Sequence, residues 1–362
     1  MKVFGAYDSC PERVRGAPGP TMASVEPAVP GPAQSGAASW LKWVAVITGS
    51  YGQGNRLRVD AHRRALVYWR AQRLPFLLVF VELLQAGEES AYADLLKHPD
   101  DRHIILRGGT EHRSLMQKEA MANIGAWQAI DALCGILVFL DADSWTADRD
   151  WLGNIQEKLH PRDPANWDRL VQPWGEFRDT HPAVDRPAHR WGSLARAIAS
   201  GVPQPESAGS PGLCWAMTSA YFEAIGGLNP FGISGSGDNL LVWELLDPGH
   251  VEKARCGFAF FREIARRDLP RGRLDWLNTR FTHEFHGWFR DRAYWYSRQI
   301  IDLFLPMRTL VRLDDQGLLV WARETPLADI LGNKAAISTP RGYCDVCRRY
   351  GLTPNLPEKM LA

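Results

Sequence analysis

The sequence predicts an α/β fold, a three-layer sandwich with a mostly parallel central sheet between helices. Two observations predict it. Short apolar runs alternate with helical stretches through residues 42–141, the pattern of parallel strands joined by crossover helices. One of these runs, residues 136–140, leads directly into Asp141-Ala142-Asp143. This places carboxylates at the carboxyl end of a strand, where ligands bind in α/β sheets.

The first strands and helices follow in order along the chain. Residues 42–47 (KWVAVI) predict the first strand, a glycine-containing turn covers 48–54, and a helix spans 55–72. Residues 75–82 (PFLLVFVE) are apolar almost throughout, which is typical of a strand buried on both faces. A helix is expected over 87–97.

A short strand over 103–106 and a long helix over 114–133 complete the series before the strand at 136–140. The pattern then changes. Residues 160–212 are rich in Pro, Gly, Trp and charged residues, which predicts long loops or a lid. Beyond them we expect a strand over 213–218 and three helices, over 219–225, 239–246 and 291–303.

Composition limits the classes of function. The 362 residues are 45% hydrophobic and 23% charged, as in soluble globular proteins. A net charge of +1 gives no electrostatic reason to bind nucleic acid, so no nucleic-acid partner is expected. The 15 tryptophans can fill the core or form platforms for sugar rings.

The cysteines and the apolar runs predict a cytoplasmic protein. The six cysteines are scattered except for Cys344 and Cys347, which form a C-x-x-C that is at most half of a zinc site. We interpret this pair as incidental or weakly redox-active. No apolar run reaches the roughly 18 residues of a membrane helix, and no signal peptide is apparent. No transmembrane segment is therefore expected.

Three regions are predicted. Residues 1–39 are rich in Pro, Gly, Ala and Ser and are expected to form a flexible tail. Residues 40–305 carry the strands, helices and motifs, and residues 306–362 form a C-terminal extension. No internal repeat is visible.

The Asp141-Ala142-Asp143 motif can be interpreted in two ways. Its carboxylates are hard oxygen ligands that suit Mn²⁺ or Mg²⁺, which can in turn hold a diphosphate. The same pattern also occurs in turns and helix caps, so the motif alone leaves both interpretations open. The motifs before and after it decide between them.

Several motifs accompany it in a fixed order. Thr48-Gly49-Ser50 follows the first strand, Glu82 ends the second, and residues 117–125 (QKEAMANIG) precede the Asp-x-Asp strand. Residues 209–238 contain a Gly-Gly turn and end in ISGSGD. Over about residues 41–305 this order resembles glycosyltransferases of the GT-A fold, in particular inverting galactosyltransferase-like and family-2-like enzymes. The resemblance implies a nucleotide-sugar half, 40–145, and an acceptor half, 146–305.

The resemblance also implies roles for individual residues. The side chains implied to bind the nucleotide sugar are Thr48, Ser50, Arg56, Glu82, Lys118, Asn123 and Asp141. Asp141 and Asp143 are implied to bind the metal. Each segment also has a structural alternative: a plain strand–turn–helix, a solvated strand end, or a surface helix with a buried Asn.

Asp238 is implied to be the general base, which takes the proton of an acceptor hydroxyl. It can equally cap the helix that begins at Asn239, since Asp is well suited to that position. Related galactosyltransferases often have an acidic pair here, whereas this chain has Asp238-Asn239.

A histidine pair lies in residues 281–287 (FTHEFHG). Mn²⁺ accepts imidazole beside carboxylates, and the resemblance implies that a late histidine completes the metal site. The i, i+3 spacing of His283 and His286 predicts that only one is a ligand. Gly287 favours His286, because it would let the backbone approach the diphosphate. A packed structural histidine is the alternative.

The predicted function is therefore metal-dependent transfer of a sugar, with a UDP-sugar as the expected donor, Mn²⁺ or Mg²⁺ as cofactor, and a sugar, glycan or other hydroxyl as acceptor. Inversion at the anomeric carbon is expected, with retention as the mechanistic alternative. A non-catalytic protein that binds nucleotide sugars or glycans is the main rival. A phosphodiesterase or nucleotidyltransferase would need more carboxylates near the first strand.

Overall fold

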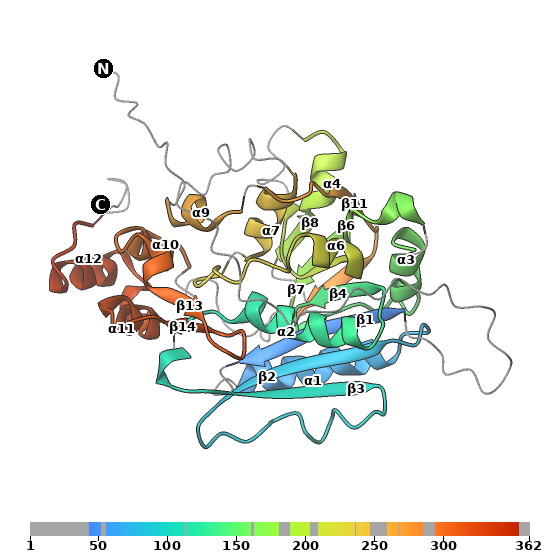
Figure 1. Ribbon diagram of the computed structural model, residues 1–362, viewed down its shortest axis with the longest axis horizontal. Coiled ribbons are helices and arrows are strands. Elements are labelled where there is room, and N and C mark those ends of the chain that lie inside the picture. Colours follow the sequence, from blue (N-terminus) through green and yellow to red (C-terminus); the bar gives the residue numbers. More distant parts are fainter. Residues whose placement is uncertain are drawn as a thin grey trace, which may run out of the picture. The chain divides into compact units, whose positions relative to one another are not determined.

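A seven-stranded sheet forms the centre of the computed structural model, within the described residues 43–51, 56–112, 114–160, 163–180, 189–202, 209–235, 237–246, 259–266, 268–284 and 294–354. Its order is β11-β6-β10-β4-β1-β2-β3. Its strands are β1 (Val44–Tyr51), β2 (Leu77–Gln85), β3 (Asp101–Gly108), β4 (Ile136–Leu140), β6 (Arg169–Gln172), β10 (Cys214–Thr218) and β11 (Arg273–Trp276). Figure 1 shows β1, β2 and β3 side by side. β10 is antiparallel to both of its neighbours, and the other pairings are parallel, which confirms the predicted mostly parallel sheet.

Two smaller sheets accompany it. The first has the order β5-β12-β7-β8-β9. Its strands are β5 (Ser144–Trp145), β7 (Glu176–Asp179), β8 (His189–Ser193), β9 (Gly209–Ser210) and β12 (Arg280–His283). The second is the antiparallel pair β13 (Val311–Leu313) and β14 (Leu319–Trp321). Since β5 follows β4 almost directly, the chain passes from the central sheet to the second sheet through the Asp-x-Asp motif.

The helices connect these strands. They are α1 (Arg56–Arg70), α2 (Lys118–Asp131), α3 (Trp151–Lys158), α4 (Leu194–Ala199), α6 (Ser219–Ala224), α7 (Gly237–Leu246), α9 (Ala259–Ile264), α10 (Tyr294–Asp302), α11 (Pro326–Gly332) and α12 (Pro340–Arg349). Single 3₁₀ turns occur at Thr110–His112, Pro164–Asn166, Met307–Thr309 and Lys334–Ile337. Within the described residues, no helix combines the length and the apolar character needed to cross a membrane.

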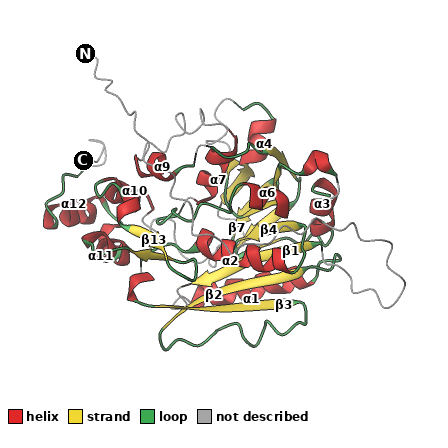
Figure 2. Cartoon of the chain, viewed as in Figure 1, coloured by secondary structure: helices red, strands yellow, loops and turns green. Residues whose placement is uncertain are grey.

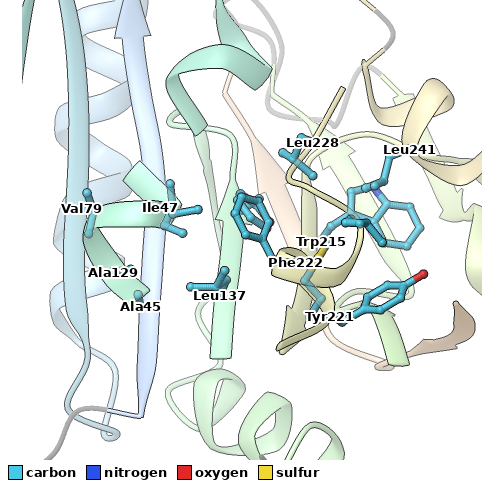
Figure 3. Packing of buried hydrophobic residues seen from close by; sticks show 14 of the residues in the cluster. Ala45, Ile47, Val79, Ala129, Leu137, Trp215, Tyr221, Phe222, Leu228 and Leu241 are labelled. Atoms are coloured by element: carbon cyan, nitrogen blue, oxygen red, sulfur yellow. The ribbon is translucent and has the colours of Figure 1, made fainter. Parts of the chain in front are cut away.

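The central sheet buries both faces, and the pleat sorts its side chains into two cores. Ala45 and Ile47 of β1 pack with Met121 of α2, whereas Val44 and Val46 lie on the other face, with side chains of α1 and α3. Figure 3 shows part of the first core, where Phe222 lies between Ile47 on one side and Trp215 on the other. Because successive residues of a strand point to opposite faces, the same alternation decides the direction of the polar side chains at the strand ends.

The helix predicted over 87–97 is wrong, because the structure forms turns there. Tyr92 anchors this segment. Its buried hydroxyl lies 2.7 Å from His62 Nδ1, and its carbonyl accepts from the backbone N–H groups of Leu95 and Leu96. These tertiary contacts outweigh the weak helical preference of a short segment.

Two further boundaries differ from the prediction. Both β1 and β2 run further than expected, to Tyr51 and Gln85. Their common ladder continues to the pair Tyr51↔Leu83, and β2 pairs with β3 as far as Gln85↔Gly108. Thr48 and Ser50 therefore lie in a strand and not in a turn.

Residues 160–212 are not only loops, since they contribute β6 to the central sheet and β7, β8 and β9 to the second. These strands have at most five residues, too few to show a clear sequence period.

The C-terminal residues share a third core with α7 and α9. Leu319, Leu327 and Tyr343 pack in one cluster with Leu240 and Phe260. Figure 2 shows α10, α11, α12 and β13 gathered together. The flexible tail predicted for 1–39 lies outside the described residues, and the division into three regions stays a prediction.

Candidate functional site

The Asp-x-Asp motif forms a turn at the end of β4, and its two carboxylates meet different partners. The turn is fixed by the Asp141 N–H, which donates to Leu213 O at 2.8 Å, and by the Ser144 N–H, which donates to Asp141 O at 3.0 Å. Asp141 lies beside α2, whereas Asp143 lies beside β12. Two clusters are built on this one turn.

The first cluster, called the lysine cluster here, consists of Lys118, Asp141 and Asp238. Lys118 Nζ lies 2.7 Å from Asp141 Oδ1 and 3.1 Å from Asp238 Oδ2. Each of the three side chains keeps a quarter to a third of its surface exposed. Burial alone would lower the pKa of Lys118, but Asp141 and Asp238 together raise it well above its usual range. The lysine is therefore a permanent cation between two carboxylates.

Gln117 and Gly125 fix the position of α2 and hence of Lys118. Gly125 lets α2 lie close to β1, since a Cβ there would come within 2.7 Å of Ile47 Cγ2. Gln117, directly before Lys118, donates from Nε2 to Leu319 O at 2.7 Å and accepts from the Leu319 N–H at 2.9 Å. Both bonds are buried, so β14 fixes the residue that directly precedes α2.

Asp238 lies in the first turn of α7, which begins at Gly237, two residues earlier than the helix start predicted at Asn239. The Glu119 carboxyl packs against Gly237, where any side chain would collide with it. Glu119 is 5% exposed, and within the described residues its Oε2 has no hydrogen-bond partner. Burial raises the pKa of Glu119 to about 8, so a neutral carboxylic acid lies beside the lysine cluster at neutral pH.

The second cluster, called the histidine cluster here, consists of Asp143, His283 and Asp179. His283 Nε2 lies 3.4 Å from Asp143 Oδ1, and His283 Nδ1 lies 2.7 Å from Asp179 Oδ1. Burial alone would lower the pKa of His283, but Asp143 and Asp179 raise it to about 10. A protonated imidazole thus bridges two carboxylates.

Glu284, the residue after His283, stabilises the histidine cluster through its backbone and its carboxylate. Its N–H donates to Asp143 O at 2.9 Å, which ties β12 to the Asp-x-Asp turn. Its carboxylate accepts from Trp145 Nε1 at 2.8 Å, from Arg64 at 3.2 Å and from Thr180 Oγ1 at 3.2 Å. Glu284 is buried, and these three donors satisfy its charge.

The donor set at Asp143 and His283 fits a divalent metal. A carboxylate oxygen and an imidazole nitrogen, 3.4 Å apart, are the mixed ligands that Mn²⁺ accepts. Within the described part of the chain, no group of three or more His, Cys, Asp or Glu side chains is arranged to hold a metal. Any further ligands would have to come from a bound diphosphate, from water or from residues outside the described ranges. His286 is one of the latter.

Thr48 and Ser50 lie on the α1 face of the sheet, opposite Lys118 and Asp141. Ser50 Oγ is 3.2 Å from Tyr92 OH, which is 2.7 Å from His62 Nδ1. Burial lowers the pKa of His62 to about 4 and raises that of Tyr92 to about 12, so both are neutral at pH 7. Tyr92 can then donate to His62 and accept from Ser50. Thr48 Oγ1 is buried without a hydrogen-bond partner within the described residues.

Glu82 is fully buried and does not end its strand, because β2 continues to Gln85. Its Oε2 lies 2.8 Å from Nε2 of His103, on the neighbouring β3. The alternative of a solvated strand end is therefore wrong. The nucleoside contact predicted for Glu82 stays a prediction, since the carboxylate already has an internal partner.

Asn123 and Arg56 lie in different surroundings. The Asn123 amide donates to Leu228 O and accepts from the Leu228 N–H, both at 2.8 Å, and so clamps the chain that follows the Gly-Gly turn. Arg56 is exposed at the start of α1. Their predicted contacts with the nucleotide sugar remain untested.

The sequence prediction missed three of the side chains described above. Asp179 ends a four-residue strand in a segment predicted to be loop, Tyr92 lies in a segment predicted to be helix, and Glu119 is next to the lysine that the motif singled out. An acidic residue at an apolar helix face is a usable signal for Glu119. Nothing local marks Asp179, because its partner His283 is 104 residues away.

A mostly parallel sheet with one reversed strand now stands beside an Asp-x-Asp turn at the end of β4. The fold is the predicted α/β sandwich with a mostly parallel central sheet. No protein-family model matches the chain, and no curated protein matches it.

Solved structures give distant matches. Residues 1–349 of TarS from S. aureus match with 11% identity over 87% of this chain and 76% of that chain, at a TM-score of 0.40. The mannosyltransferase PcManGT from Pyrobaculum calidifontis, solved with GDP-Man and Mn²⁺, matches with 15% identity over 89% of this chain and 79% of that chain, at a TM-score of 0.37. The 4-diphosphocytidyl-2C-methyl-D-erythritol synthase of Anaerococcus prevotii matches with 11% identity over 66% of this chain and 88% of that chain, at a TM-score of 0.32.

Proposed function

We propose that the chain is a metal-dependent glycosyltransferase that moves a sugar from a nucleotide sugar to an acceptor hydroxyl. The observation that carries the proposal is the meeting of Lys118, Asp141 and Asp238 on one side of the Asp-x-Asp turn with Asp143 and His283 on the other. Residues far apart in sequence, each singled out by its motif, gather at the carboxyl end of one strand. A UDP-sugar is the proposed donor.

Asp238 is proposed to act as the general base. Its carboxylate accepts the proton of the acceptor hydroxyl as that oxygen forms a bond to the anomeric carbon, and the bond from this carbon to the diphosphate oxygen breaks with its electron pair. Attack from the side opposite the leaving group inverts the anomeric centre. When Asp238 has taken the proton, Lys118 remains paired with Asp141, so the lysine charge is still balanced.

Asp143 and His283 are proposed to hold Mn²⁺ or Mg²⁺. When bound, such a metal acts as a Lewis acid that stabilises negative charge on the leaving diphosphate. Lys118 adds a second, permanent positive charge on the other side of the turn. Lys118 is held by Asp141 and Asp238 before the reaction starts, so this charge needs no rearrangement during it.

The proposal is tested by binding and turnover on the same preparation. Calorimetry with UDP, GDP and CDP, with and without Mn²⁺, should give binding of one nucleoside diphosphate that depends on the metal. Release of that nucleotide from its sugar conjugates should then be measured. Absence of binding to every nucleoside diphosphate in the presence of Mn²⁺ would refute the proposal.

The rival function is binding of nucleotide sugars or glycans without turnover. It is favoured if the metal-dependent binding is present but no donor releases its nucleotide on any acceptor. Asp238→Asn serves as the matched control for turnover, because it preserves the size of the side chain but cannot take up a proton in the same way.

A further inference from the structure

Asp179 takes no part in the reaction proposed above, yet it makes the shortest contact of the histidine cluster. It is the last residue of β7 and lies in register with His283 of β12. Its Oδ1 is 2.7 Å from His283 Nδ1, whereas the distance from His283 Nε2 to Asp143 is 3.4 Å. Each of the two imidazole nitrogens therefore faces a different carboxylate.

We propose that Asp179 is a positioning residue, which accepts the Nδ1–H of His283 so that Nε2 faces Asp143 and binds the metal. The inference rests on the proposed metal-dependent function. It adds Asp179, a residue on a different strand, to the set that decides metal affinity.

The chemistry of imidazole gives the reason. A histidine that binds a metal through Nε2 must carry its proton on Nδ1, and a carboxylate at Nδ1 selects this form. It also makes Nε2 a better electron-pair donor. Without such a partner the proton can move to Nε2, and that nitrogen then has no free lone pair for the metal.

The surrounding structure fixes the ring in this orientation. The Thr180 N–H donates to His283 O at 2.9 Å, so the backbones of β7 and β12 are joined beside the side-chain contact. The ring of Phe177, on the same strand as Asp179, meets the His283 ring edge-on at 6.1 Å between centroids. β7 therefore supplies both the acceptor and the packing surface for the imidazole.

Mn²⁺ binding tests the inference without any sugar donor. Free Mn²⁺ is followed by electron paramagnetic resonance for the wild-type protein and for Asp179→Asn and Asp179→Ala, with Mn²⁺ alone and with added UDP. Replacing an acidic partner of a metal-bound histidine weakens metal binding by about 10- to 100-fold. We expect this loss for Asp179→Ala and a smaller loss for Asp179→Asn, whose amide oxygen can still accept from Nδ1–H.

Two comparisons separate positioning from a general structural effect. Asp275→Asn removes another carboxylate that is 25% exposed, lies in β11 of the central sheet and pairs with Lys158 and Arg169 instead of His283, and it should leave Mn²⁺ affinity unchanged. In the His283→Ala background, Asp179→Ala should cause no further loss, because Asp179 acts through His283.

The outcomes are distinct. Wild-type Mn²⁺ affinity in Asp179→Ala would overturn the inference but leave the proposed function standing. A further loss of affinity in the His283→Ala background would also overturn the inference, because it would mark Asp179 as a direct ligand. Failure of the wild-type protein to bind Mn²⁺ in either arm would overturn the proposed function itself.

Discussion

The lysine cluster and the histidine cluster share one design, a cationic side chain between two carboxylates. In one, Lys118 lies 2.7 Å from Asp141 and 3.1 Å from Asp238. In the other, His283 lies 3.4 Å from Asp143 and 2.7 Å from Asp179. The Asp-x-Asp turn supplies one carboxylate to each cluster.

The difference lies in what the cation can release. Lysine keeps its proton and has no lone pair to offer, so the lysine cluster is a site of fixed charge. Histidine can give up the Nε2 proton and become a metal ligand, so under the proposed function the histidine cluster would exchange a proton for a metal. Two residues of one short motif can thus serve two different purposes.

The largest expected effect distinguishes the two clusters by activity. Asp238→Asn should lower kcat by about 10²- to 10⁴-fold, because the proposed general base is lost, and should leave Mn²⁺ affinity unchanged. Asp143→Asn should weaken Mn²⁺ binding itself. Nucleotide release and paramagnetic resonance of Mn²⁺ measure the two effects. If Asp238→Asn weakened Mn²⁺ binding as much as Asp143→Asn, the clusters would form a single site.

The next effect concerns the neutral acid beside the lysine cluster. The pKa of Glu119 is raised from 4.5 to about 8 in the folded protein, so folding takes up a proton between these values. The contribution of Glu119 to the free energy of unfolding is most favourable below pH 4.5. It is lost as pH rises towards 8, by up to about 1.4 kcal/mol per pH unit.

Glu119→Gln should therefore flatten the fall in the free energy of unfolding across this window. Urea unfolding at several pH values measures it. The exposed Glu157→Gln is the control and should keep the slope of the wild-type protein. Equal slopes for wild type and Glu119→Gln would show that Glu119 is already ionised at low pH.

Removing the fixed cation should have a moderate effect. Lys118→Met leaves Asp141 and Asp238 facing each other, which should lower the free energy of unfolding by about 1–2 kcal/mol, below the cost for a fully buried pair because these side chains are partly exposed. Adding Asp238→Asn should recover part of the loss, while Mn²⁺ affinity stays constant. A loss of Mn²⁺ binding in Lys118→Met would couple the clusters.

The smallest effect is expected at the edge of the histidine cluster. Arg64 is 52% exposed, and its pair with Glu284 at 3.2 Å should contribute less than about 1 kcal/mol. Arg64→Ala should therefore melt close to the wild-type temperature, because Trp145 and Thr180 still bind Glu284. Arg63→Ala, which breaks an exposed pair on the same helix, is the control. A large shift for Arg64→Ala alone would show that α1 holds the cluster.

The parts of the fold that the sequence predicts are those with local signals. An apolar run that ends in two carboxylates marks β4 and its turn, and the long helical stretch before it marks α2 and Lys118. The predicted helix over 87–97 fails because one tyrosine, Tyr92, is captured by His62 and Ser50 from elsewhere in the chain.

The histidine cluster is less accessible to sequence reasoning. His283 was predicted as one of two possible ligands, but Gly287 favoured His286, which lies outside the described residues. Asp179 was missed because β7 is short and because Asp179 pairs with His283, which lies 104 residues away in the sequence. Register across such distances leaves no local pattern.

The buried clamp between Gln117 and Leu319 spans 202 residues and sets the start of the helix that carries Lys118. During synthesis, the Asp-x-Asp strand leaves the ribosome long before Leu319 does. The lysine cluster therefore gains its final geometry only after Leu319 has emerged. Such a long-range closure delays the final placement of Lys118 until residues far along the chain have been made.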